Sequence, residues 1–400
     1  MSKLEELIEQ YCPDGVEYYK IKDVYKRIKG TPITAGKMKE IATPDGSVRI
    51  FAGGKTVIDA NEKDIPNANI TRVPAVLIQS RGVIDAVYYD KPFTFKNEMW
   101  AYTTFNQKSV KYLYYILKSN IQTFRDAASG MGALPQISLG VTEEFEIPVP
   151  PLPVQEEIVR ILDAFTELQA ELQAELQKRK QQYNYYRDNL LTNFTQEQAP
   201  KEYTLGEVTV DIYSGATPSK EKREYWVNGT IPWMSSGEVN LGQVYEVEGR
   251  ITQLGYDKCS TKMVPEGSVV IALAGQGKTR GTVAILRTSV CTNQSLAALV
   301  PQKEIVSGEY LYYYLKTQYA KLREVSAGDG TRGGLNLKML RAYKVVIPSH
   351  KAQDQIVSIL DRFDSLTNDL TSGLPAEIEK RRQQYEYYRD KLLTFKRKGA

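Results

Sequence analysis

The sequence predicts an α+β protein with an internal duplication, in which two β-rich domains alternate with two long helices. The segment VQEEIVRILDAF (154–165) recurs as AQDQIVSILDRF (352–363), and KRKQQYNYYRDNLLT (178–192) recurs as KRRQQYEYYRDKLLT (380–394). Apolar residues in these segments repeat at the three- and four-residue steps of a helix, whereas short β-type runs with Gly, Pro and Asn turns precede them. We expect the two helices to pack as an antiparallel coiled coil with pseudo-twofold symmetry.

The first half begins with a β-rich domain expected at 1–150, which carries an N-terminal amphipathic helix at 2–10. Its β-type runs include SVRIFAGG and AVLIQSRG. The proline-rich link IPVPPLPVQ marks a boundary, and the first long helix is expected at 151–195. This segment contains TELQAELQAELQ, which consists of strong helix formers, so we predict one continuous helix.

The second half repeats this order, with a β-rich domain expected at 200–348 and the second long helix at 349–396. Its β-type runs include IPWMSSGEV and SVVIALAG. The helix contains Ser372, Gly373 and Pro375, a helix stop followed by a proline that suits a new first turn. We therefore predict a break near 372–375.

The two helices carry matching apolar seams that are expected to form the coiled coil and contact partners. Tyrosines in these seams are interpreted as packing groups rather than base-stacking groups. The seam residues are Ile158, Leu162, Phe165, Leu172, Tyr183, Tyr186, Leu190, Ile356, Leu360, Phe363, Leu370, Tyr385, Tyr388 and Leu392.

Composition excludes several classes of protein. The 400 residues are 42% hydrophobic and 25% charged with a net charge of +4, which is typical of a globular protein and permits a nucleic-acid partner without requiring one. No apolar run is long enough for a membrane span. The three cysteines lack paired spacing, which predicts neither disulfides nor zinc and favours a cytoplasmic location. One histidine, His350, stands alone, so histidine-based catalysis is not expected.

The stretch ALAGQGKTRG (272–281) contains the Gly-Lys-Thr of a phosphate-binding loop but not its context. Ala272 stands where the motif requires its first glycine, and a β-type run follows instead of a helix. Nucleotide binding is therefore not expected. When Arg280 is aligned with Arg81 of the first half, the second copy carries five extra residues in this loop. We interpret the loop as a divergent insertion on a shared scaffold.

The chain resembles the specificity subunit of type I restriction–modification systems over essentially its whole length. The residues that carry the resemblance are IPVPPLPVQEEIVRILDAF and its second copy, the two KR-rich helix ends, and YTLGEVTVDIYSGATPSKEKREYWVNGTIPWMSSGEV. The beginning of the first domain departs from this pattern, because Lys22 stands where the second domain has Gly206. The resemblance implies that the β-rich domains are target-recognition domains.

The resemblance further implies that each recognition domain reads one half of a bipartite, asymmetric DNA site in the major groove, where base edges are distinguishable. The helices would set the half-site spacing and bind two adenine-N6 methyltransferase subunits, and two motor-nuclease subunits would complete the restriction enzyme. The subunit itself would be non-catalytic. S-adenosylmethionine and ATP would belong to the partner subunits, and the chain would hold no cofactor or metal.

The motif content agrees with a non-catalytic chain. It contains no Asp-Pro-Pro-Tyr or Asn-Pro-Pro-Phe methyltransferase motif, and no Gly-x-Gly-x-x-Gly loop follows a predicted strand. Two other interpretations stay open at this point. One is a scaffold whose domains bind protein or carbohydrate, because fold does not determine function. The other is a DNA-recognition or scaffold subunit of a related defence system with different partners.

Candidate DNA contacts are the polar and basic residues of glycine-containing loops, which can approach phosphates and base edges. Any one of them could equally be a solvated turn residue. In the first domain they are Thr31, Lys37, Lys39, Lys55, Arg72, Gln79, Ser80, Arg81, Asn97 and Met131. In the second domain they are Thr217, Ser219, Lys220, Lys222, Arg223, Ser235, Ser236, Gln276, Lys278, Thr279, Arg280, Asn293, Thr331 and Arg332.

Overall fold

The computed structural model divides into two compact units, each of which contains one β-rich domain and parts of both long helices. One unit comprises Met1–Gln173 and Glu377–Ala400, and the other comprises Ala174–Ala376. The structure describes residues 2–54, 56–129, 134–275, 279–326, 334–368 and 373–399.

The domain of the first unit contains a four-stranded sheet of order β2-β8-β5-β6 and a three-stranded sheet of order β4-β3-β7. In the smaller sheet β3 pairs antiparallel with β4 and parallel with β7. The strands are β1 (Tyr18–Lys20), β2 (Lys26–Lys29), β3 (Val48–Phe51), β4 (Val57–Ala60), β5 (Ala75–Gln79), β6 (Asp85–Tyr89), β7 (Phe93–Phe95), β8 (Trp100–Thr103) and β9 (Glu146–Pro148). The helices are α1 (Lys3–Tyr11), α2 (Ile21–Val24), α3 (Ala35–Ile41), η1 (Glu62–Asp64), α4 (Gln107–Ser119), α5 (Ile121–Asp126) and α6 (Leu139–Glu143).

The domain of the second unit repeats this topology with one additional edge strand in each sheet, so that the sheet orders are β11-β19-β16-β17-β13 and β14-β12-β18-β15. In the smaller sheet the inner strand β12, like β3 of the first domain, pairs antiparallel with one neighbour, β14, and parallel with the other, β18. The strands are β10 (Lys201–Thr204), β11 (Thr209–Ser214), β12 (Ile231–Met234), β13 (Gln243–Val244), β14 (Arg250–Ile251), β15 (Met263–Val264), β16 (Val269–Ala272), β17 (Val283–Leu286), β18 (Val290–Thr292), β19 (Leu296–Pro301) and β20 (Lys344–Ile347). The helices are η2 (Gln196–Gln198), η3 (Arg223–Tyr225), η4 (Ser236–Leu241), α8 (Gln253–Asp257), α9 (Gly308–Thr317), α10 (Tyr319–Val325) and α11 (Leu337–Ala342).

Each larger sheet is covered by a tyrosine-rich helix, α4 in the first domain and α9 in the second. Side chains cap both helices, Asn106 for α4 and Ser307 for α9, which satisfies first-turn N–H groups. Buried tyrosines then anchor each helix to a closing strand. Tyr112 Oη donates to the carbonyl of Pro148 at 3.2 Å, and Tyr310 Oη donates to that of Val346 at 2.9 Å. The duplication therefore extends to individual buried hydrogen bonds.

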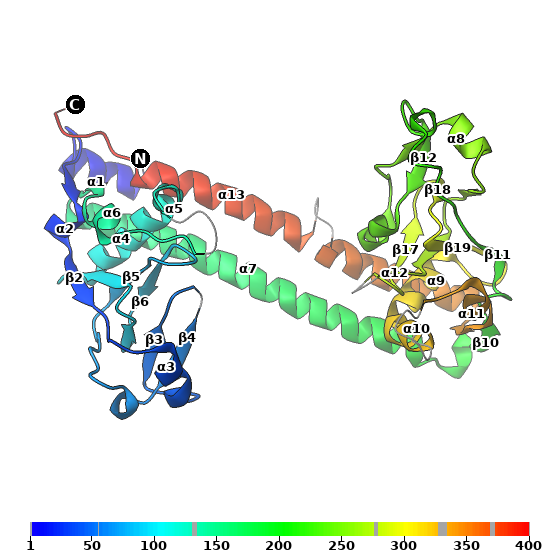
Figure 1. Ribbon diagram of the computed structural model, residues 1–400, viewed down its shortest axis with the longest axis horizontal. Helices are drawn as coiled ribbons and strands as arrows, with labels where there is room; N and C mark the ends of the chain where they lie inside the picture. The colour runs from blue at the N-terminus through cyan, green and yellow to red at the C-terminus, as the bar shows by residue number, and fades with distance from the viewer. Residues whose placement is uncertain are drawn as a thin grey trace. The chain divides into compact units, whose positions relative to one another are not determined.

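The first long helix, α7 (Leu152–Thr192), is a single helix of 41 residues (Figure 1), which confirms the continuous helix predicted from its composition. The second long segment is described as α12 (His350–Asn368) and α13 (Leu374–Leu393). The seam residue Leu370 lies outside the described residues, and so does part of the predicted break near 372–375.

The helices pair antiparallel within each unit through equivalent aromatic contacts. In the first unit, Phe165 near the start of α7 stacks on Tyr388 near the end of α13, with ring centroids 5.7 Å apart. In the second, Phe363 of α12 stacks on Tyr186 near the end of α7, also at 5.7 Å. Within each unit, the first part of one helix thus meets the end of the other, which confirms the predicted antiparallel coiled-coil pairing and the internal duplication.

Among the described residues, no helix is both long and apolar enough to cross a membrane. In the same part of the chain, no group of three or more His, Cys, Asp or Glu side chains is arranged to hold a metal ion. Cys12, Cys259 and Cys291 are free thiols.

Candidate nucleic-acid interface

Most of the predicted contact loops of the first domain converge at one edge, which we call the first four-loop edge and define as 30–32, 52–54, 80–82 and 96–98. Backbone hydrogen bonds hold these loops together. Thr31 N donates to Phe95 O at 2.7 Å, Lys96 N donates to Phe51 O at 3.0 Å, and Gly54 N donates to Arg81 O at 3.1 Å. The edge is therefore a fixed surface built from the ends of both sheets.

The second domain has a corresponding second four-loop edge at 215–217, 235–237, 273–275 and 293–295. Ala216 N donates to Thr292 O at 3.0 Å, and Asn293 N donates to Met234 O at 3.1 Å. Leu273 N donates to Ser295 O at 2.8 Å and ties the hairpin loop to the turn. Two copies of one scaffold thus present the same four loops.

A glycine makes the first loop of each edge possible. A Cβ atom at Gly30 would lie 2.1 Å from Phe95 O, and one at Gly215 would lie 1.8 Å from Thr292 O. Both distances are far inside van der Waals contact, so only glycine allows this approach of two backbones.

We expect Gly215→Ala to destabilise the second domain by about 1–3 kcal/mol, because the new methyl group overpacks against the backbone of β18. Urea unfolding followed by tryptophan fluorescence measures this, since Trp233 Nε1 donates to the neighbouring Ala216 O at 3.0 Å. Gly237→Ala is the matched control, because its Cβ meets nothing within 4 Å. Equal stability of the two variants would contradict the steric argument.

The hairpin loop is longer in the second domain, but by four residues rather than the five expected from the sequence. Seven residues separate the paired Ile78 and Ala86, whereas eleven separate the paired Ile271 and Val283. The equivalence follows from hydrogen bonds that Ser80 O accepts from Ile137 N and Leu273 O accepts from Leu335 N, both at 3.0 Å. The expected number was wrong because the sequence alignment matched Arg81 with Arg280. The strand registers instead make Ala86 equivalent to Val283, which does not place these two arginines at the same position.

The structure separates the first-domain candidates into exposed and buried groups. Lys39, Arg81 and Asn97 are exposed at or beside the first four-loop edge, where Lys39 and Arg81 line a hollow of about 390 Å³. Thr31 and Ser80 are fully buried.

The buried candidates have protein partners. The Thr31 and Thr94 hydroxyls lie 2.7 Å apart, and Ser80 Oγ donates to Glu98 O at 2.5 Å. Gln79 is also buried, in β5. In this conformation these three residues position the edge rather than face outward.

Two further first-domain candidates, Lys37 and Arg72, lie off the edge. Lys37 pairs with Glu40 at 2.6 Å and Arg72 pairs with Glu62 at 2.6 Å, both on the surface. Lys55 and Met131 lie outside the described residues. Contact of any of these side chains with DNA stays a prediction.

In the second domain Thr217, Ser235, Ser236 and Asn293 belong to the second four-loop edge. Thr217 Oγ1 donates to Oε1 of Gln294, a residue that sequence reasoning missed. Ser235 forms a capping box with Glu238 at the start of η4.

The other second-domain candidates that the structure describes lie in flanking loops. Thr279 and Arg280 are half-buried, and the carbonyl of Arg280 accepts from Arg323 Nη1 at 3.2 Å. The group around η3 is exposed and comprises Ser219, Lys220, Lys222 and Arg223. Outside the described residues lie Gln276, Lys278, Thr331 and Arg332.

Sequence reasoning missed polar residues in the turn that closes each edge, namely Lys96 and Glu98 in the first domain and Gln294 and Ser295 in the second. Lys96 Nζ and a Glu98 carboxylate oxygen form an ion pair at 2.9 Å. The available signal was the matching position of FTFKNEMW and VCTNQSLA between two β-type runs of each half.

The seam residues of the long helices differ in how far their side chains are buried. Fully buried or nearly so are Ile158, Leu162, Tyr183, Ile356 and Leu360. Leu172, Leu190, Phe165, Phe363, Tyr385 and Leu392 are half-buried, while Tyr186 and Tyr388 are exposed.

Two further tyrosines, Tyr185 and Tyr387, are 65% and 64% exposed at equivalent positions of the two helices. Each unit therefore presents one copy of the same tyrosine-bearing helix surface.

Each domain is joined to a long helix by a tyrosine–aspartate hydrogen bond. Tyr115 Oη donates to Asp163 at 2.5 Å, and Tyr313 Oη donates to Asp361 at 2.6 Å. Burial, together with the hydrogen bond to Asp361, raises the pKa of Tyr313 far above its ordinary value. The phenols therefore stay protonated as donors, which fixes each domain against its helix.

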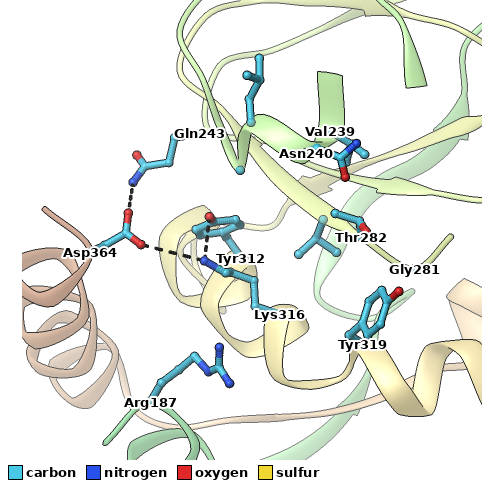
Figure 2. A pocket seen from close by; sticks show the side chains of 13 residues that line it. Arg187, Val239, Asn240, Gln243, Gly281, Thr282, Tyr312, Lys316, Tyr319 and Asp364 are labelled. Atoms are coloured by element: carbon cyan, nitrogen blue, oxygen red, sulfur yellow. Dashed lines mark hydrogen bonds and ion pairs between the residues drawn. The ribbon is translucent and has the colours of Figure 1, made fainter. Parts of the chain in front are cut away.

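The second unit adds a polar pocket of about 440 Å³ at this joint (Figure 2). Lys316 Nζ lies 3.2 Å from Tyr312 Oη and 4.0 Å from the Asp364 carboxylate, to which Gln243 Nε2 donates at 3.1 Å. Burial lowers the pKa of Lys316. The Gln243–Asp364 and Lys316–Asp364 contacts connect β13 and α9 to α12.

Comparisons with known proteins agree on one family. The model of the type I restriction modification DNA specificity domain matches residues 13–179 and 199–380. The specificity subunit of the type I restriction enzyme EcoR124I/EcoR124II from Escherichia coli is 39% identical over 297 residues, which cover 72% of each chain. A putative type I specificity subunit of Mycoplasma pneumoniae is 27% identical over 385 residues, covering 95% of this chain and 98% of that one.

Solved structures show the same fold at low sequence identity. The type I restriction–modification S subunit from M. genitalium matches with a TM-score of 0.61 and 18% identity, covering 95% of this chain and 96% of that one. A chain from a structural study of complex assembly and conformational transition of the type I R-M system matches with a TM-score of 0.57 and 18% identity, covering 95% and 98%.

Proposed function

Because the chain belongs to the family of type I restriction–modification DNA specificity subunits, we propose that each β-rich domain reads one half of a bipartite, asymmetric DNA site in the major groove. The long helices set the distance between the half-sites and bind two adenine-N6 methyltransferase subunits. Two motor-nuclease subunits complete the restriction enzyme. The chain itself is non-catalytic, and S-adenosylmethionine and ATP are held by its partners.

The observation that carries this proposal is the repetition of one four-loop edge with different side chains. The second domain keeps the strand order of the first, with one additional edge strand in each sheet, and repeats the backbone hydrogen bonds that hold the first and last loops of the edge. This provides the same platform twice. The loops on that platform differ in length and residue type, as two readers of different half-sites require. A bipartite, asymmetric target is what two such readers in one chain would recognise.

The charge at the first four-loop edge suits a nucleic acid. Lys39, Arg81 and Lys96 line one hollow, and Arg27 and Lys29 line the neighbouring one. Cationic side chains at such a surface neutralise phosphates and release counterions, which gives affinity without sequence preference. Sequence preference then comes from polar side chains that reach base edges.

The repeated helix surface supports the proposed number of methyltransferase subunits. Tyr185 and Tyr387 occupy equivalent exposed positions, one in each unit. Exposed tyrosines are enriched at protein interfaces, because they bury a large area and keep a polar group at the rim. Two equivalent surfaces accommodate two copies of one partner.

The test is to mix the protein with its cognate methyltransferase subunit and S-adenosylmethionine, and to map N6-methyladenine across a random-sequence DNA library. We expect methylation at one asymmetric motif with two specified parts and a fixed gap. Each wrong base pair in either part should reduce methylation by about 5- to 150-fold, from a cost of about 1–3 kcal/mol. Methylation without sequence preference, or no complex, would contradict the proposal.

A further inference from the structure

One turn has the same backbone in both domains but different side chains. It joins β7 to β8 as Lys96-Asn97-Glu98 and β18 to β19 as Asn293-Gln294-Ser295. Met99 N donates to Lys96 O at 3.0 Å, and Leu296 N donates to Asn293 O at 3.2 Å. Together with the hydrogen bonds that tie the turn to β3 and β12, these contacts give both copies one geometry. We call them the first and second reading turns.

The pattern of exposure in the two reading turns is also the same. The middle residue, Asn97 or Gln294, is exposed, and each flanking residue is half-buried. The middle residue carries a carboxamide in both domains, a group suited to adenine N6 and N7. The flanking residues differ in charge and hydrogen-bonding capacity, with a lysine and a glutamate in one domain and an asparagine and a serine in the other. The reading turns therefore combine constant geometry with variable chemistry.

Glu98 is the least expected residue for a surface that faces DNA, because phosphates repel a carboxylate. Its side chain is only 26% exposed and is paired with Lys96, which offsets this repulsion. A carboxylate can only accept hydrogen bonds, so at a base edge it pairs with an exocyclic amine, and its typical partner is cytosine N4. Glu98 also borders both hollows of the first edge, between the cationic groups Lys39 and Arg81 on one side and Arg27 and Lys29 on the other.

We propose that the reading turns determine which bases each domain selects, with Glu98 accepting a hydrogen bond from cytosine N4 in the first half-site. This inference rests on the proposed function, because it needs the four-loop edges to face the major groove. Cations on both sides of Glu98 contact phosphates, while the turn projects between them to the base edges. In the second domain, Thr217 holds the side chain of Gln294 in place.

The test replaces the flanking residues of the first reading turn with those of the second, Lys96→Asn with Glu98→Ser, and maps N6-methyladenine with the cognate methyltransferase subunit. The expected result is a change of base preference at one or two positions of a single half-site, with the other half-site and the gap unchanged. Methylation at the original site should fall about 5- to 150-fold. The reverse exchange, Asn293→Lys with Ser295→Glu, should change only the other half-site.

A nearly isosteric variant guards against misfolding of the exchanged turn. Glu98→Gln keeps the shape but adds a donor amide, so discrimination at one C·G pair should relax while the remaining positions keep their preference. Lys20→Asn with Glu144→Ser is the matched control. These two residues form an exposed ion pair of the same domain, with Nζ and a carboxylate oxygen 2.7 Å apart, and neither belongs to the first four-loop edge. This control should leave the motif unchanged.

The outcomes separate the inference from the proposed function. Failure of the unaltered protein to direct methylation to a split site would overturn the proposed function. The other outcome is that the unaltered protein methylates a split site and that both half-sites stay unchanged in the exchanged and Glu98→Gln variants. This result would overturn only the proposal that the reading turns select bases.

Discussion

Deletion of one four-residue repeat from α7, Leu168–Glu171, is expected to lower methylation at the native site by at least about tenfold and to move the preferred gap to about one or two base pairs fewer. α7 is one continuous helix through this repeat, so four residues shorten it by about 6 Å at 1.5 Å per residue. One base-pair step of duplex is about 3.4 Å. The measurement is the gap length in the mapped motif, with DNA libraries that vary the spacer.

An insertion and a variant of unchanged length also test whether the length of α7 sets the gap between the half-sites. A second copy of Leu168–Glu171 inserted after Glu171 should lengthen the preferred gap by about one or two base pairs. Glu167→Ala with Glu171→Ala alters two exposed side chains without changing helix length and should leave the gap as it is. Unchanged gaps in both length variants would show that α7 does not set the spacing.

The long helices could be predicted because their information is local and repeated. A run of strong helix formers gives α7 without reference to tertiary contacts, and near-identical repeats show the duplication directly. The pairing of the helices follows because matching apolar seams need a partner to bury them. The topology of the two sheets was not predictable from these features, since parallel pairing of β3 with β7 joins segments far apart in the chain.

The loops of the four-loop edges could be picked out from the sequence, but the burial of their side chains could not. Thr31 follows a glycine in a polar stretch, a pattern typical of a solvated turn. It is nevertheless fully buried, because Gly30 lets the backbone approach Phe95 and the hydroxyl meets Thr94. Conversely, Glu98 was not among the candidates, and local sequence does not show that its carboxylate pairs with Lys96 at this edge. Which polar residues face outward depends on strand partners that the local sequence does not specify.

Replacement of the two equivalent phenylalanines should produce a crossed pattern of local unfolding. Phe165 contacts Tyr385 and Tyr388, so Phe165→Ala should loosen the end of α13. Phe363 contacts Tyr183 and Tyr186, so Phe363→Ala should loosen the end of α7. Both phenylalanines are half-buried, and we expect each to contribute about 2–3 kcal/mol, somewhat below the cost of removing a fully buried ring.

Native-state hydrogen exchange can detect this pattern, because local opening follows the local free energy. Amides of residues 380–393 should exchange about 30- to 150-fold faster in Phe165→Ala, while those of 178–192 keep their rates. Phe363→Ala should show the reverse. The antiparallel pairing requires this result, since each phenylalanine supports the end of the other helix rather than its own. Faster exchange confined to the mutated helix, or equal effects on both helix ends in each variant, would contradict the pairing.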